Sequence, residues 1–218
     1  MKRIIIICEG QTEQEFCNDV LQPHFNRLEI YLENPVVKKT QGGIVNWEAL
    51  KFQVETLLKK DKTAIVTILI DYYGIHKHHK YPNWEEAKNI NDKNDAMQLM
   101  EAGMLNDITS DLQNRFIPYI QLHEFEGLLF SDLKVFDDNF ENKEFLNYDY
   151  LVATIRDFSN PEMINDGSET APSKRLSNII RGYSKVIYGS LIAEEIGLLK
   201  IRERCPRFNE WITKLENV

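Results

Sequence analysis

Short, uninterrupted apolar runs dominate the hydrophobic pattern of this chain. The first covers residues 3–8 (RIIIIC), and the strongest covers residues 63–70 (TAIVTILI) and ends at Asp71. Continuous runs of β-branched residues are typical of strands that are buried on both faces of a parallel sheet. The run at residues 117–122 and a shorter one at residues 35–38 predict two further strands.

Helical periodicity follows these runs. Thr12 and Glu15 match the capping-box pattern, which predicts a helix that begins at Thr12. The apolar residues at helical spacing behind it are Phe16, Val20, Leu21, Phe25 and Leu28. After a turn at residues 41–43, a helix capped by Asn46 is predicted to run to about residue 60, and another covers residues 95–114. Strands and helices therefore alternate, which predicts an α/β fold whose parallel sheet of about four strands is flanked by helices.

The pattern changes beyond residue 132, where no further strand is predicted and helical spacing prevails. Residues 160–168 are rich in turn formers and predict a loop, and Ser173 is placed as the cap of the next helix. A closing amphipathic helix is indicated by Phe208, Trp211, Ile212 and Leu215. We expect one domain over residues 1–218, in which an α/β core (1–132) carries a helical C-terminal extension (133–218) packed on the sheet.

Charge is unevenly distributed along the chain. The formal net charge is −8 over 218 residues, which argues against indiscriminate binding of nucleic acid through bulk charge. Residues 171–207 nevertheless contain eight basic side chains and three acidic ones. An acidic front part followed by a basic rear part suits a metal-assisted site for a polyanion, although two separate solvated surfaces would give the same pattern.

The three cysteines and the apolar segments bear on the compartment. An odd number of cysteines without metal-ligand spacing favours free thiols in a reducing cytoplasm. The apolar run at the start stops at Glu9, which is too early for a secretory signal, and no stretch approaches the ~20 apolar residues of a membrane span. We therefore expect a cytoplasmic protein that has no membrane partner.

Carboxylates follow the ends of three predicted strands. Glu9 and Glu13 follow the first strand, Asp71 ends the third, and Glu124 and Glu126 follow the fourth. Ligands of open parallel sheets bind at the carboxyl ends of the strands, so we expect these side chains to converge at one edge. Clustered carboxylates repel one another without a cation, and Mg²⁺ prefers hard oxygen ligands. The pattern predicts a site for Mg²⁺ or Mn²⁺ formed by Glu9, Glu13, Asp71 and Glu126.

These residues also have structural interpretations. Glu13 lies in a first helical turn, where acids favour the helix dipole, and Asp71 could cap a loop. The segment HKHHK at residues 76–80 could bind a metal, but the lysines between its histidines favour a solvated loop. Lys174 and Arg175 stand at a helix start, where such a pair is commonly surface charge.

Longer motifs resemble a known family. CEGQTEQEF after the first strand and LIDYYG after the third resemble the two signature motifs of Toprim domains, and the spacing of Glu9 and Glu13 is similar to that in overcoming-lysogenization-defect nucleases. PYIQLHEFEGLLFSD, PEMINDGSETAPSKRL and IGLLKIRERCPRFNEW resemble a Toprim-related bacterial family classed as a domain of unknown function, number 4276. The resemblance covers almost the whole chain.

The resemblance implies a Toprim-like fold and Mg²⁺-dependent cleavage or transfer at a nucleic-acid phosphodiester. Glu9 and Glu13 match the first motif, and Asp71 matches the first acid of the second. Tyr73 stands where Toprim proteins have a second aspartate, so a glutamate that follows the fourth strand would have to compensate. Relatives are often encoded beside an ABC-type ATPase in bacterial anti-phage systems, which implies such a partner.

The combined interpretation is a metal-dependent phosphodiesterase that acts on DNA or RNA. Glu9, Glu13 and Asp71 would hold the metal, while Glu124, Glu126 or His123 would position or deprotonate the attacking water. Lys174 and Arg175 would neutralise charge that develops on the phosphate. Lys185 and Arg202 are further candidates for the same role. The main alternative is a non-catalytic docking or regulatory module of an ATPase.

Overall fold

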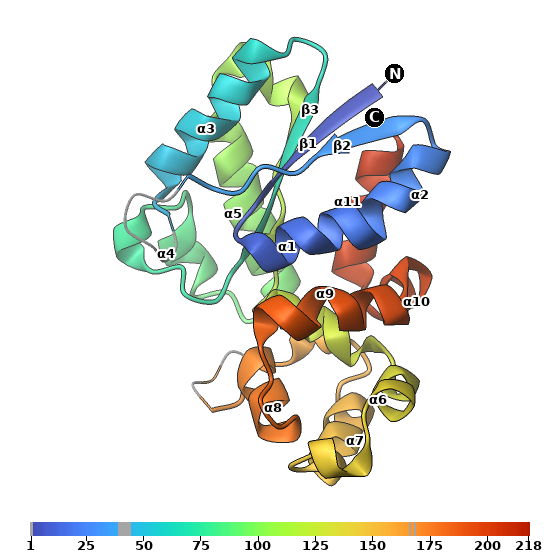
Figure 1. The fold of residues 1–218 in the computed structure, drawn as a ribbon. Coiled ribbons are helices and arrows are strands. Elements are labelled where there is room, and N and C mark those ends of the chain that lie inside the picture. Colours follow the sequence, from blue (N-terminus) through green and yellow to red (C-terminus); the bar gives the residue numbers. More distant parts are fainter. Residues whose placement is uncertain (1, 39–44, 166, 168) are drawn as a thin grey trace.

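The protein is built on a parallel β-sheet that is flanked by helices (Figure 1). The structure is a computed structural model, and it describes residues 2–38, 45–165, 167 and 169–218. The strand order is β2-β1-β3-β4, and β5 also pairs with β3. The strands are β1 (Lys2–Cys8), β2 (Ile30–Glu33), β3 (Ile65–Asp71), β4 (Phe116–Ile117) and β5 (Ile120–Gln121). All pairings between these strands are parallel, which confirms the predicted fold class.

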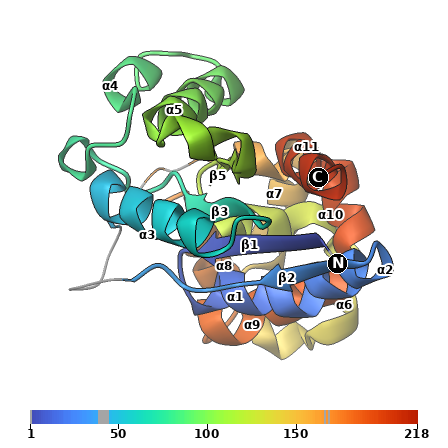
Figure 2. The same cartoon turned by 90° about the horizontal axis from the view of Figure 1, so that it is seen from above.

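Strand β1 is buried on both faces, as its apolar run predicts. Ile4 and Ile6 belong to one hydrophobic cluster, whereas Ile5 and Ile7 belong to a second cluster on the opposite face. The two clusters place helices on both sides of the sheet, as Figure 2 shows. The run of isoleucines thus reflects a strand with no solvent face.

Two strand predictions need correction. The short strand predicted at residues 35–38 lies too late, because the paired strand is β2 at Ile30–Glu33 and only Val36 forms a single bridge with Cys8. The predicted strand at residues 117–122 is split into β4 and β5. Pro118 lacks the N–H that would continue the ladder, so the break falls where a donor is missing. The predicted turn at residues 41–43 lies outside the described residues.

The helices of the front half follow the predicted order with adjusted ends. They are α1 (Gln11–Phe16), a π-helical turn (Cys17–Leu21), α2 (Gln22–Arg27), α3 (Trp47–Lys60), α4 (Trp84–Ala87) and α5 (Lys93–Asp107). Asn46 caps α3 as predicted, since its side chain accepts the Ala49 N–H. The capping residues of α1 were predicted wrongly: the cap is Gly10, whose N–H donates to Glu13 Oε2 at 2.9 Å. Helix α5 ends earlier than predicted, and a 3₁₀ segment covers Ser110–Arg115.

The back half is helical, as predicted. A 3₁₀ helix η4 (Phe125–Ser131) leads into α6 (Leu133–Asn139), α7 (Tyr148–Asp157), α8 (Pro172–Ile179), α9 (Lys185–Ile196), α10 (Leu198–Arg204) and α11 (Pro206–Glu216). Helices α9, α10 and α11 pack on the face of the sheet that also carries α1, whereas α3 and α5 cover the other face. No helix within the described ranges is long and apolar enough to cross a membrane.

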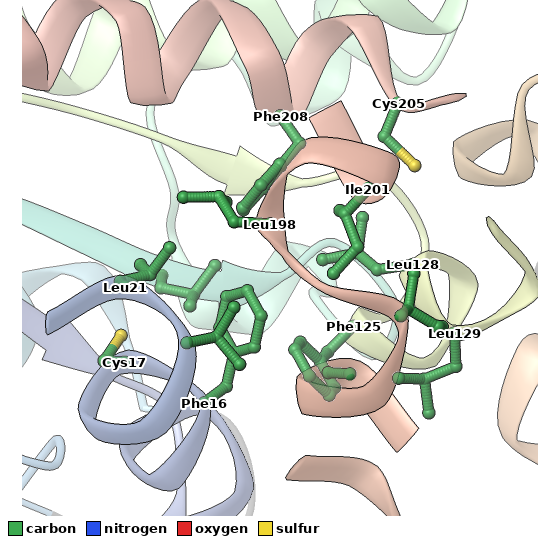
Figure 3. Close-up of a cluster of buried hydrophobic side chains, with 14 of the residues drawn as sticks. Phe16, Cys17, Leu21, Phe125, Leu128, Leu129, Leu198, Ile201, Cys205 and Phe208 are labelled. Carbon is green, nitrogen blue, oxygen red and sulfur yellow. The ribbon is translucent and has the colours of Figure 1, made fainter. Parts of the chain in front are cut away.

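One hydrophobic cluster joins the two halves of the chain. Figure 3 shows Phe16 of α1 packed against Phe125 of η4, with Ile201 and Phe208 of the C-terminal helices alongside. The rings of Phe16 and Phe125 lie 5.1 Å apart in an edge-on arrangement. Residues from both predicted parts, 1–132 and 133–218, therefore share one core, and the extension packs on the sheet.

The segment predicted as a loop contains a buried carboxylate, Glu162, that holds the closing helix. The loop includes a 3₁₀ turn at Pro161–Met163, and Glu162 accepts the N–H groups of Arg207 at 2.9 Å and Phe208 at 3.0 Å. Burial raises the pKa of Glu162 to about 7, against the effect of these backbone donors and of the Arg207 charge. The helix start thus depends on a carboxyl that titrates near neutral pH.

We expect Glu162→Gln to flatten the pH dependence of stability. The folded-state pKa of Glu162 lies above its unfolded value, so its contribution is complete below about pH 4 and is lost as the pH rises through about 7. Between about pH 5 and about pH 8, the wild type should lose about 2 kcal/mol more unfolding free energy than the variant. Urea unfolding at both pH values measures this difference. Parallel pH profiles for the two proteins would contradict the expectation.

Candidate functional site

Strands β1 and β3 end at the same edge of the sheet, beside the start of α9 (Figure 1). Glu9 follows β1 directly, Asp71 is the last residue of β3, and Glu126 lies in η4, which follows β5. Helix α9 contacts both α1 and η4 at this edge. Gly189 permits the close approach to α1, because a Cβ there would lie 2.6 Å from Thr12 Cγ2. The predicted convergence of acids from separate strand ends is therefore present.

A lysine lies at the centre of these acids. Lys185 Nζ is 3.1 Å from Glu13 Oε1, 3.2 Å from Glu126 Oε2 and 3.5 Å from Asp71 Oδ2. The three carboxylate side chains are at most 8% exposed, whereas the lysine side chain is 37% exposed. One ammonium group thus pairs with three buried carboxylates, and its stem reaches them from the surface.

Backbone N–H groups orient the acids independently of the lysine. Glu13 Oε2 accepts the Gly10 N–H at 2.9 Å, and Asp71 Oδ1 accepts the Phe125 N–H at 2.8 Å. Glu9 Oε2 accepts the N–H of Asp71 at 2.9 Å, which joins the ends of β1 and β3. Glu13 and Asp71 therefore each have one oxygen held by the backbone and the other turned toward Lys185.

The surroundings of the cluster disfavour the ionised form of two of its acids, Asp71 and Glu126. Burial raises the pKa of Asp71 well above its ordinary value; Lys185 opposes this, and the carboxylates of Glu9, Glu13 and Glu126 add to it. Burial also raises the pKa of Glu126, again against the effect of Lys185. Burial alone would lower the pKa of Lys185, but the surrounding acids raise it well above normal. The lysine is thus firmly charged, and the acids have more negative charge than it balances.

Three carboxylate oxygens of the cluster accept no hydrogen bond from the described residues. Among the described residues, neither oxygen of Glu126 has a hydrogen-bond partner, and the same holds for Glu13 Oε1. Lys185 Nζ lies within 3.2 Å of Glu126 Oε2 but outside hydrogen-bond geometry. We regard this contact as an ion pair that leaves acceptor capacity unused, which is unusual for a buried carboxylate.

The donor set fits a hard divalent cation in its chemistry. Carboxylate oxygens from Glu9, Glu13, Asp71 and Glu126 are the ligand type that Mg²⁺ and Mn²⁺ prefer. Within the described ranges, however, no three acidic, histidine or cysteine side chains already stand at metal-ligand spacing. The oxygens instead surround an ammonium group. A metal ion at this point would require the carboxylates to draw closer together.

Glu124 has a different role from Glu126. Its oxygens accept the Ser173 N–H at 2.8 Å and the Ser173 hydroxyl at 3.0 Å, so it fastens the first turn of α8. The predicted cap at Ser173 is wrong, because the cap position of α8 is Ala171. Glu124 is one of the residues predicted to activate water, but both of its carboxylate oxygens already accept hydrogen bonds from Ser173. Lys174, the next residue of α8, is exposed.

The other predicted phosphate-binding residues do not join the cluster. Arg175 is buried, its guanidinium donates to the Thr170 carbonyl and the Thr154 hydroxyl, and it stacks over Tyr150. Arg202 lies on α10, beyond the whole length of α9, and pairs with Glu216. Structural partners therefore occupy both guanidinium groups, and only Lys185 of the basic candidates lies among the acids.

Tyr73 occupies the position of the expected second aspartate. Its side chain is 38% exposed, and its N–H donates to the His123 carbonyl at 2.8 Å. Glu126, and not a residue of the β3 motif, supplies the further carboxylate beside Asp71. The histidine-rich segment at residues 76–80 is largely exposed, in line with its interpretation as a solvated loop.

Sequence reasoning missed two features of the site. The sequence predicts only a phosphate-binding role for Lys185 and no role for Tyr183. The buried Tyr183 hydroxyl has no hydrogen-bond partner among the described residues. Burial raises its pKa, and the charge of Glu126 adds to the effect, which places the hydroxyl near the acids. The helical pattern beyond residue 132 gave no signal for the place of either residue.

Comparison with known proteins gives one match. The family described as a domain of unknown function (DUF4276) matches residues 8–216. Neither the search of curated proteins nor that of solved structures found a match. The matched range contains all the acids of the site, together with Tyr183 and Lys185.

Proposed function

The chain belongs to this DUF4276 family, and we propose that it is a divalent-metal-dependent phosphodiesterase or phosphodiester transferase that acts on nucleic acid. One observation carries the proposal: Glu13, Asp71 and Glu126, from separate elements, meet around a single lysine, and Glu9 accepts the N–H of Asp71 beside them. Three buried carboxylates against one ammonium leave an excess of buried negative charge. A divalent cation is the partner that would neutralise it. The Toprim resemblance of the segments that follow β1 and β3 points the same way.

Asp71, Glu13 and Glu126 would hold the ion, with Glu9 beside them. When bound, Mg²⁺ or Mn²⁺ would polarise the scissile phosphate and lower the pKa of a coordinated water. The chain itself would orient the ligands through the N–H groups of Gly10 and Phe125, which fix one oxygen each of Glu13 and Asp71. Preorganised ligands of this kind need little rearrangement during the reaction.

Basic groups at the edge of the site would bind the substrate phosphate. Lys174 is exposed on the first turn of α8, which Glu124 fastens through Ser173. In this arrangement Glu124 is a positioning residue, since it fixes the turn that carries the lysine. Lys185, whose side chain is 37% exposed, is the second cation within reach of a phosphate at the cluster.

The proposal is tested by metal binding and cleavage with the same protein samples. Titration calorimetry with Mn²⁺ is compared for the wild type, Asp71→Asn and Glu9→Gln. Labelled single-stranded, duplex and transfer-RNA substrates are then incubated with Mg²⁺ or Mn²⁺. We expect the wild type to bind the ion and cleave at least one substrate, and both variants to lose cleavage while remaining folded. Equal cleavage by all three proteins, or no ion binding by the wild type, would refute the proposal.

A second candidate function is a non-catalytic docking module for an ABC-type ATPase. The observation that favours it is an apolar surface on α9: Val186, Ile187 and Leu191 are 46%, 60% and 55% exposed. Adjacent exposed apolar side chains commonly mark a protein interface. Lys185 would then be a permanent structural partner of the acids. This candidate predicts that Mn²⁺ leaves the melting temperature of the protein unchanged and that no substrate is cleaved in its presence.

We expect Tyr183→Phe to lower cleavage about tenfold if the hydroxyl donates to the substrate or to the attacking water. Because this buried hydroxyl has no partner among the described residues, its removal should leave the unfolding free energy within about 0.5 kcal/mol of the wild type. Single-turnover cleavage and urea unfolding measure the two effects. Unchanged cleavage would show that the hydroxyl takes no part in the reaction.

A further inference from the structure

The position of Lys185 has a consequence for how a metal ion enters the site. Its ammonium faces Glu13 Oε1, Asp71 Oδ2 and Glu126 Oε2. For Glu13 and Asp71 these are the oxygens that the backbone leaves available, because the Gly10 and Phe125 N–H groups take the other two. An ion bound by the same acids would therefore compete with Lys185 for the oxygens that face it.

We propose that Lys185 is an exchangeable internal cation: its ammonium occupies the acid cluster in the metal-free protein and leaves when a divalent ion binds. This inference rests on the proposed function, since it assumes that the cluster binds a metal. An ion with ligand distances of 2.0–2.1 Å draws the carboxylates inward. An ammonium group that now lies 3.1 to 3.5 Å from the same oxygens cannot share that point.

The lysine is placed so that it can leave without disturbing the fold. It is the first residue of α9, and its side chain is 37% exposed. A cation at a helix N-terminus is disfavoured by the helix dipole, so the acids are what keep it there. Its stem is flexible, and the exposed part of the side chain already faces solvent.

The acids remain in place after the exchange. Glu13 and Asp71 are held by backbone N–H groups that do not depend on the lysine. Glu126 is fully buried within η4. The released ammonium would stay tethered beside the ion, where it can contact a substrate phosphate. One residue would therefore act as a counterion in the metal-free state and as a phosphate ligand in the loaded state.

Lysine labelling on the wild-type protein tests the exchange. Samples stripped with a chelator are treated with acetic anhydride with and without saturating Mn²⁺, and acetylation of each lysine is quantified by peptide mass spectrometry. Lys200 is a matched internal control, because its side chain is also 37% exposed and pairs with Glu203 at 2.9 Å. Calorimetry on the same samples establishes whether Mn²⁺ binds.

We expect acetylation of Lys185 to rise severalfold with Mn²⁺ while that of Lys200 stays constant. In Asp71→Asn, which lacks one of the oxygens, Mn²⁺ should have no effect on Lys185. Binding of Mn²⁺ without a change at Lys185 would show that ion and ammonium coexist; the exchange would then be wrong although the proposed metal function stands. Absence of Mn²⁺ binding would overturn both.

Discussion

In the absence of divalent ions, Lys185→Met is expected to lower the free energy of unfolding by about 2–3 kcal/mol. The substitution keeps most of the side-chain stem but removes the cation that lies within 3.5 Å of Glu13, Asp71 and Glu126. Loss of one partner from a buried ion pair costs about 3–5 kcal/mol, and the 37% exposure of the lysine side chain reduces this value. Urea unfolding in the presence of a chelator measures the effect.

The same variant should respond to pH in a defined direction. Burial raises the pKa values of Asp71 and Glu126 even with the lysine present. Carboxyls with raised folded-state pKa values favour the folded protein at low pH and lose that contribution as the pH rises. The deficit of Lys185→Met should therefore be smaller at about pH 5 than at about pH 8, because protonation relieves the uncompensated charge.

Lys200→Met is the matched control for this experiment. It removes a lysine of equal exposure from a surface pair with Glu203, and such pairs contribute about 0–1 kcal/mol. Its unfolding free energy should stay within about 0.5 kcal/mol of the wild type. Equal stability of the Lys185 and Lys200 variants would show that the acid cluster does not depend on its central cation.

The elements that the sequence predicted well are those with two-sided burial or explicit caps. The isoleucines of β1 and the run that forms β3 are buried on both faces, so their apolar pattern is uninterrupted. Asn46 could be recognised as the cap of α3 because asparagine is a residue type that is favoured at that position. The edge strand β2 was missed because only Ile30 and Leu32 face the core and Tyr31 is exposed, which leaves an alternation too short to identify.

The candidate site could be predicted as far as strand ends determine it. Glu9 and Asp71 meet because parallel strands end at one edge, and this rule needs no tertiary information. The central place of Lys185 depends on how α9 docks against α1 and η4, which are both distant from it in the chain. The different fates of Glu124 and Glu126 depend on whether the chain turns into a 3₁₀ or an α-helix, which composition does not determine.

The pair Glu126 and Glu124 therefore offers the sharpest functional test. We expect Glu126→Gln to lower metal-dependent cleavage by at least about 100-fold, because it removes a charge that faces the ion position. The stability of the metal-free protein should stay level or rise by about 1 kcal/mol, since Glu126 is fully buried and burial raises its pKa. Loss of activity without loss of stability is typical of residues that are kept for function.

Glu124→Gln is the matched control, because it changes the same functional group two residues earlier. Its carboxylate holds Ser173 through two hydrogen bonds, so we expect a stability loss of about 1 kcal/mol and less than about a tenfold change in cleavage. Cleavage rates at saturating Mn²⁺ and urea midpoints for both variants give the comparison. If Glu124→Gln abolished cleavage while Glu126→Gln retained it, the ion would have to bind beside α8, and the cluster around Lys185 would be structural.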